Sequence, residues 1–71
     1  MVKERLIAPT VIETLERNGA LDAEDLLKSV QKLHGDLDRR VFEEALVGLE
    51  IQGLIKVYDM SRDKRRIELV R

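Results

Sequence analysis

The sequence contains no cysteine and no tryptophan, and it has only one histidine, one phenylalanine, one tyrosine and one proline. Without cysteine there are no disulfides, thiolate nucleophiles or zinc–sulfur clusters, and His34 alone cannot build a histidine metal site. One phenylalanine and one tyrosine provide no stacking platform for unpaired bases, which argues against single-stranded nucleic acid as a ligand. We therefore expect no metal and no cofactor.

Enzyme motifs are also missing. There is no glycine-rich phosphate loop and no HExxH, and neither serine, Ser29 or Ser61, lies in a nucleophile context. The paired carboxylates Glu43 and Glu44 are adjacent, so on a helix they would point roughly 100° apart rather than share a substrate. The sequence predicts neither catalysis nor a small-molecule site.

No apolar run approaches the roughly 18 residues of a membrane span, and charges interrupt residues 1–9 where a secretory signal would be apolar. We expect one cytoplasmic domain over residues 1–71, without membrane contact. Its 13 basic and 14 acidic side chains nearly balance, so any attraction for nucleic acid must be local. The composition, with many charged residues, no cysteine and two methionines, resembles that of proteins from thermophiles.

The clearest helix signal spans residues 38–52. Asp38 is a suitable N-cap, and Leu37 before it is spaced to pack on Phe42. Gly53 supplies the left-handed residue that ends a helix. The apolar stripe of this helix, at a period of 3.6 residues, is Phe42, Ala45, Leu46 and Leu49.

Two further helices are predicted before it, over residues 9–18 and 22–34. Pro9 suits a first turn, and Thr10 with Glu13 has the spacing of a capping box. Asp22 is the expected cap of the second helix after a strand stub at residues 20–21. Gly19 and Gly35 are expected to close these helices, and His34 is expected to be a half-buried packing residue.

After Gly53 the apolar period changes to two, which predicts a β-hairpin over residues 54–70. Residues 61–65 lack the Asn-Gly or Asp-Gly of a tight turn, so a longer, mobile loop is expected. The expected core comprises Val11, Ile12, Leu15, Leu26, Leu27, Val30, Phe42, Leu46, Leu49, Ile55, Ile67 and Leu69.

The order helix, strand stub, helix, turn, helix and hairpin resembles the winged helix-turn-helix superfamily. The resemblance is carried by Leu46-x-x-Leu49-x-x-x-Gly53-Leu54-Ile55 and the hairpin after it. It implies an α+β fold of three helices with a C-terminal two-stranded wing. It also implies a transcription regulator that binds duplex DNA, with the third helix in the major groove and the wing on the backbone.

The resemblance implies DNA contacts from six residues: Arg39, Arg40, Arg62, Lys64, Arg65 and Arg66. Two arginines in the first turn oppose the helix dipole, which suggests a use beyond helix stability. The alternative is that they balance Glu43 and Glu44 on the helix surface. Positive charge is concentrated in these two places, because residues 10–37 carry six acidic and three basic side chains.

The outward face of the third helix departs from a base-reading pattern. It carries Glu44, Val47, Gly48 and Ile51, where carboxylates repel phosphate and aliphatic side chains read little beyond a thymine methyl group. Contacts to the DNA backbone are therefore expected rather than base readout. The alternative function is a protein-docking or homodimerising module that uses this face. A third possibility is that the N-terminal segment, including Leu6 and Ile7, folds over it.

Overall fold

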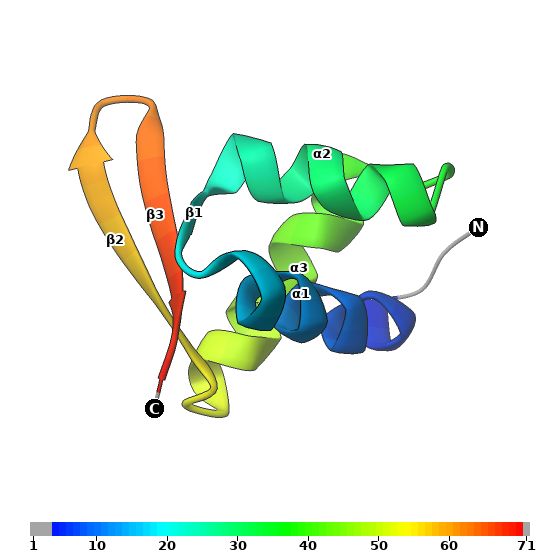
Figure 1. Ribbon diagram of the computed structural model, residues 1–71, viewed down its shortest axis with the longest axis horizontal. Coiled ribbons are helices and arrows are strands. Elements are labelled where there is room, and N and C mark those ends of the chain that lie inside the picture. Colours follow the sequence, from blue (N-terminus) through cyan, green and yellow to red (C-terminus); the bar gives the residue numbers. More distant parts are fainter. Residues whose placement is uncertain (1–3, 71) are drawn as a thin grey trace.

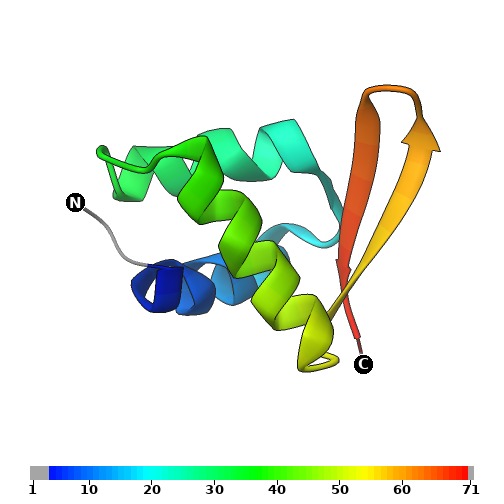
Figure 2. The ribbon, with the colours of Figure 1, turned by 180° about the vertical axis from the view of Figure 1, so that it is seen from behind.

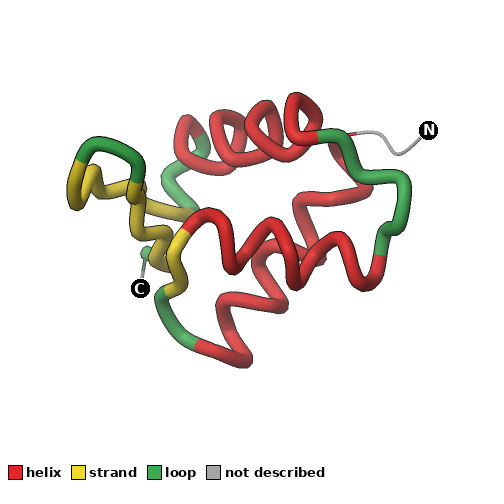
Figure 3. The backbone as a smooth tube through the Cα atoms, turned by 90° about the horizontal axis from the view of Figure 1, so that it is seen from above, coloured by secondary structure: helices red, strands yellow, loops and turns green. Residues whose placement is uncertain are grey.

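The computed structural model describes the backbone of residues 4–70 and the side chains of residues 6–70. The elements in chain order are α1 (Glu4–Asn18), β1 (Leu21–Asp22), α2 (Ala23–Leu33), α3 (Arg39–Ile51), β2 (Ile55–Ser61) and β3 (Lys64–Leu69). The helices lie together, and the sheet stands at one end of them (Figure 1). The tube view from above shows the same separation of helices and strands (Figure 3). This small α+β arrangement is compatible with a winged helix.

Helix α3 begins and ends as its sequence predicts. The Asp38 side chain accepts a hydrogen bond from the backbone N–H of Arg40, and Leu37 and Phe42 are both buried. Gly53 has a φ of 78°, the left-handed conformation that glycine adopts without steric cost. Figure 2 shows α3 crossing in front of α1 and α2, so one side faces the core and the opposite side faces outward.

Helix α2 is capped as expected but ends differently. The Asp22 carboxylate accepts from the backbone N–H of Glu24. The prediction for Gly35 was wrong: in residues 4–70, positive φ occurs only at Gly19 and Gly53. The backbone N–H of His34 donates to the Val30 carbonyl and ends the helix without a left-handed residue.

The predicted start of α1 at Pro9 was wrong. The helix begins at Glu4 and continues through the proline. Proline inside a helix removes one N–H donor and crowds the preceding turn, at a cost of about 3 kcal/mol. The extra residues bury the Ile7 side chain completely, within the core that α1 shares with α2 and α3. Burying an isoleucine contributes about 1.5–3 kcal/mol, which offsets most of that cost.

The earlier start also removes the capping box predicted for Thr10 and Glu13. Thr10 lies inside α1, where its hydroxyl is 2.8 Å from Nε2 of His34 and its carbonyl accepts from the Thr14 hydroxyl. Glu13 accepts a hydrogen bond from Arg17, one turn further along the helix. His34 is half-buried against α1, as its predicted packing role requires.

The sheet has three strands rather than the two expected for the wing. The stub β1 pairs antiparallel with β3, and the strand order is β1-β3-β2. Pairing with β3 gives the backbone of the stub hydrogen-bonding partners that a two-residue strand lacks on its own.

The hairpin tip is shorter than predicted. Ser61 pairs with Lys64, which leaves Arg62 and Asp63 as a two-residue turn. Between Asp59 and Ser61 the register shifts by one residue, so Met60 forms a bulge. A bulge increases local strand twist, which lets a short turn close here without the positive φ that type I′ turns need.

The core contains most of the predicted residues, while Ile12 and Leu69 are partly buried at its edge. The members that the expected core omitted are Ile7, Ala23, Leu37 and Ala45. Of these, Ile7 is the one whose burial depends on the unpredicted first turns of α1.

Substitution of neighbouring residues tests these first turns of α1. Ile7→Ala is expected to lower the free energy of unfolding by about 2–5 kcal/mol, because it leaves a cavity in the core. Leu6→Ala is the matched control: Leu6 is 57% exposed, so its change is expected to stay within about 0.5 kcal/mol. Urea denaturation followed by circular dichroism measures both. Equal effects would contradict a helix that begins at Glu4.

Candidate nucleic-acid interface and the outer face of α3

Two elements carry the six basic residues predicted to contact DNA. Arg39 and Arg40 occupy the first turn of α3, which the Asp38 cap places at the start of the helix. The hairpin of β2 and β3 carries the other four: Arg62, Lys64, Arg65 and Arg66. The structure brings one residue of the hairpin, Arg65, across to α3.

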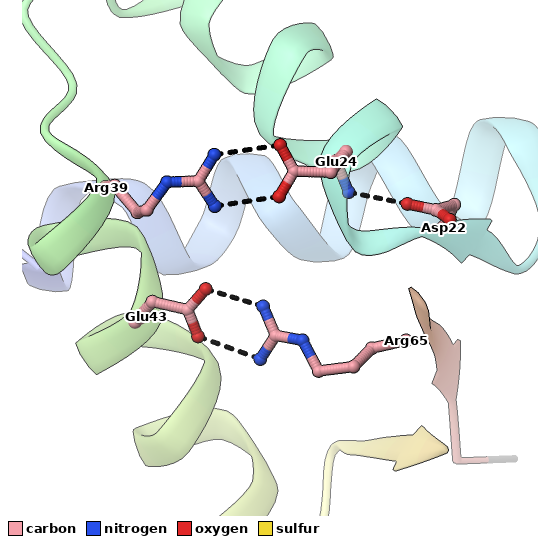
Figure 4. Close-up of polar contacts among 5 residues, drawn as sticks. All are labelled: Asp22, Glu24, Arg39, Glu43 and Arg65. Atoms are coloured by element: carbon pink, nitrogen blue, oxygen red, sulfur yellow. Dashed lines mark hydrogen bonds and ion pairs between the residues drawn. The ribbon is translucent and has the colours of Figure 1, made fainter. Parts of the chain in front are cut away.

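Arg39 is held by a carboxylate from α2. Its two terminal nitrogens donate to the two carboxylate oxygens of Glu24 at 2.7 and 2.8 Å (Figure 4). This hydrogen-bonded pair lowers the pKa of Glu24 and raises the pKa of Arg39. Both side chains remain about half exposed. The partner is therefore neither Glu43 nor Glu44, the alternatives that α3 itself offered.

Arg65 is held in the same two-pronged way by α3. Its terminal nitrogens donate to Glu43 at 2.9 and 2.6 Å, and each side chain is about one-third exposed (Figure 4). The hydrogen bond to Glu43 raises the pKa of Arg65. Bidentate arginine–carboxylate pairs combine charge with fixed geometry. This pair therefore ties the hairpin to the first half of α3.

The other four basic residues predicted to contact DNA differ in whether they form an ion pair. Arg66 lies 3.3 Å from Glu68, on the same strand. Arg40, Arg62 and Lys64 are exposed and make no ion pair with any side chain of residues 6–70. Half of the predicted DNA-contacting residues thus keep their charge available to an external anion.

The outer face of α3 is open, as its periodicity predicts. Val47 is 54% exposed and Ile51 is 80% exposed, on the side opposite the buried Phe42. Leu6 and Ile7 do not cover this face, because Ile7 is in the core and Leu6 is itself exposed. The rest of the predicted N-terminal cover, residues 1–5, lies outside the side chains that the structure describes. An open groove of about 420 Å³ runs along the face, lined by Arg40, Glu43, Glu44, Val47, Gly48 and Ile51.

A second groove, of about 350 Å³, lies between α1 and α3. Gly48 lines both grooves, so the apolar surface continues from α3 past this glycine onto Pro9 and Ile12 of α1. Leu54, 44% exposed, lines the same groove. The sequence did not point to this surface because it depends on the position of α1.

Other kinds of site find no support in the described residues. Among the side chains of residues 6–70, no three histidine or carboxylate groups converge as metal ligands. None of the helices within residues 4–70 is long and apolar enough to cross a membrane.

Comparison with known proteins adds no relative. No protein family matches the chain, and neither the curated proteins nor the solved structures include one with significant similarity.

Double-mutant cycles compare the hairpin ion pair with an exposed one. We expect a coupling free energy of about 1 kcal/mol for Arg65 and Glu43, because the bidentate contact joins two elements and is partly shielded from water. The matched control is Arg17 and Glu13, both more than 65% exposed, with an expected coupling of about 0.3–0.5 kcal/mol. Urea denaturation of alanine variants measures both couplings. Equal couplings would contradict a structural role for the hairpin pair.

Acid should weaken the contact between Glu24 and Arg39. The folded state lowers the pKa of Glu24, so its stabilising contribution is present above the ordinary glutamate pKa and is lost as pH falls through the lowered value. Glu24→Gln should therefore reduce stability at neutral pH and reduce the further loss on acidification to about pH 3. Denaturation at both pH values tests this, with Glu16→Gln, at an exposed glutamate of α1, as the control. The same acid-induced loss in Glu24→Gln and wild type would refute it.

Proposed function

We propose that this protein is a winged-helix domain that binds duplex DNA through its phosphates, as a transcription regulator of low intrinsic sequence selectivity. The observation that carries the proposal is a set of three exposed basic side chains, Arg40, Arg62 and Lys64, that form no ion pair with the side chains of residues 6–70. We call them the free basic group. Phosphate contacts of this kind position a protein on DNA without reading its sequence.

The ion pairs reduce the number of basic residues that are free to contact DNA. Arg39 and Arg65 would have to give up two-pronged bonds to carboxylates before they could bind phosphate. Arg66 shares its charge with Glu68. These three residues therefore shape the surface, whereas the free basic group meets the DNA.

The outer face of α3 supports backbone binding over base reading. Its exposed side chains include Glu44, Val47 and Ile51, none of which donates a hydrogen bond to a base edge. A glutamate pointed at the major groove would also repel the flanking phosphates. The hairpin tip with Arg62 and Lys64 is accordingly the main contact, and Arg40 adds a second point of attachment.

A salt titration of DNA affinity tests the proposal. Three phosphate contacts predict that log K falls against log salt concentration with a slope of about −3 by counterion release. Arg62→Ala and Lys64→Ala should each bring the slope about one unit closer to zero. Fluorescence anisotropy on a mixed-sequence duplex between about 50 and 200 mM salt measures this.

Lys32→Ala is the matched control for these variants. It removes one positive charge from an exposed position on α2, so net charge changes equally while the free basic group stays intact. Wild-type slope is expected for this variant. Absence of binding at low salt, or an equal loss in Lys32→Ala and Lys64→Ala, would remove the proposal.

A second candidate function, docking to a protein, is favoured by a separate observation. Val47 and Ile51 form an exposed aliphatic strip beside Gly48, within an open groove. Exposed apolar strips with polar rims are typical of protein interfaces. On this alternative the outer face of α3 is the contact surface.

A further inference from the structure

We propose that the outer face of α3 binds the same face of a second copy of this chain, with the two α3 helices antiparallel. The inference rests on the second candidate function, protein docking, and it specifies the partner. It does not require DNA, although it uses Arg40, which the proposed DNA contact also uses. The proposal is carried by the exposed aliphatic strip together with an inverted distribution of charge along α3.

Apart from the Asp38 cap, the charges within α3 oppose the dipole of the helix. The helix has no acidic residue in its first turn and no basic residue in its last turn. Arg40 stands instead at its positive end, and Glu50 stands near its negative end. Each charge in such a position costs the isolated helix a few tenths of a kcal/mol. Both side chains are exposed and form no ion pair with the described residues.

An antiparallel second copy reverses that relationship. The Arg40 end of each helix then lies against the other helix's end, which carries Glu50 and the negative pole of the dipole. Because a two-fold contact uses the same patch twice, this match occurs at both ends of the interface. The two ends of the face are thus complementary to each other, and this is why we assign a second copy rather than an unrelated protein, although the two Glu44 carboxylates near the centre repel each other.

The spacing along α3 fits this arrangement. Ile51 lies eleven residues after Arg40, about three turns and roughly 16 Å along the axis, and on nearly the same side of the helix. With a two-fold axis between Glu44 and Val47, Arg40 of one copy stands over Ile51 of the other. The aliphatic stem of the arginine can cover the isoleucine while its guanidinium reaches Glu50.

Gly48 and the neighbouring groove supply the close approach that two helices need. Gly48 has no side chain and lines both the groove on α3 and the one toward α1. The groove toward α1 is lined mainly by apolar side chains, including Pro9 and Ile12. The second copy can therefore extend its contact beyond Val47 and Ile51 onto α1, towards the roughly 800 Å² per partner that a stable interface buries.

The first test measures the mass of the full chain in solution, without DNA. Light scattering over a concentration series up to about 1 mM should show a reversible dimer of the 8.2 kDa chain. Ile51→Glu should raise the dissociation constant at least about 100-fold, because it buries an unpaired charge in each half of the contact. Leu33→Glu is the matched control: Leu33 is 65% exposed on α2, and this variant should dimerise as wild type does.

The second test identifies the partner and its direction by charge reversal. Arg40→Glu and Glu50→Arg should each weaken the dimer about tenfold, and the double variant should return to within about threefold of wild type. Circular dichroism confirms folding of every variant. A monomeric wild type, a dimer unaffected by Ile51→Glu, or a double variant without recovery would overturn the inference. The Arg62→Ala and Lys64→Ala titrations decide DNA binding separately, because these two residues take no part in the dimer contact.

Discussion

Burial of one side of α3 is the constraint on which the rest of the structure depends. Phe42 and Leu49 lie in the core. The regular geometry of a helix then fixes the direction of all its other side chains. Once this stripe is buried, Val47 and Ile51 must face outward, and Glu43 comes within reach of the hairpin. Among the described residues no further layer covers the outer side, where Val47 and Ile51 stay exposed. The core therefore determines what the molecule presents to partners.

The elements that sequence reasoning located depend on local chemistry. The Asp22 and Asp38 caps act within two residues of themselves, and the left-handed Gly53 follows directly from a stop signal. The start of α1 depends on tertiary packing instead, because burial of Ile7 outweighs the local rule that proline disfavours a helix interior. The strand stub was predicted at residues 20–21, but its pairing with β3 at Leu21–Asp22 was missed for the same reason, since that contact is made only in the folded chain.

The candidate site likewise has features that depend on local sequence and features that depend on long-range contacts. The outward strip on α3 could be predicted because a period of 3.6 residues assigns each position to a side. The engagement of Arg39 and Arg65 could not, because their carboxylate partners lie 15 and 22 residues away in the chain. From the sequence, only carboxylates on the same helix could be proposed as ion-pair partners. The fold thus turns two predicted DNA contacts into structural ion pairs.

The two proposed functions share Arg40 but otherwise use different parts of the surface. Arg62 and Lys64 belong to the hairpin tip, whereas Val47 and Ile51 belong to α3. A second copy seated on α3 would prevent that helix from entering a DNA groove, and it would claim Arg40 for the protein contact. DNA would then be held by the hairpin tips alone. A dimer would join two weak phosphate-binding points on one body, which raises the affinity through multivalency.

The bulge at Met60 bears on how copies of this chain can meet at all. Strand β2 is the longer of the two edge strands of the sheet, and an edge strand offers unpaired backbone groups to any other extended chain. The bulge interrupts the regular spacing of those groups near the tip, and the exposed Lys56 places a charge on the same strand. Edge-to-edge growth of the sheet, the route toward fibrous aggregates, is thereby discouraged.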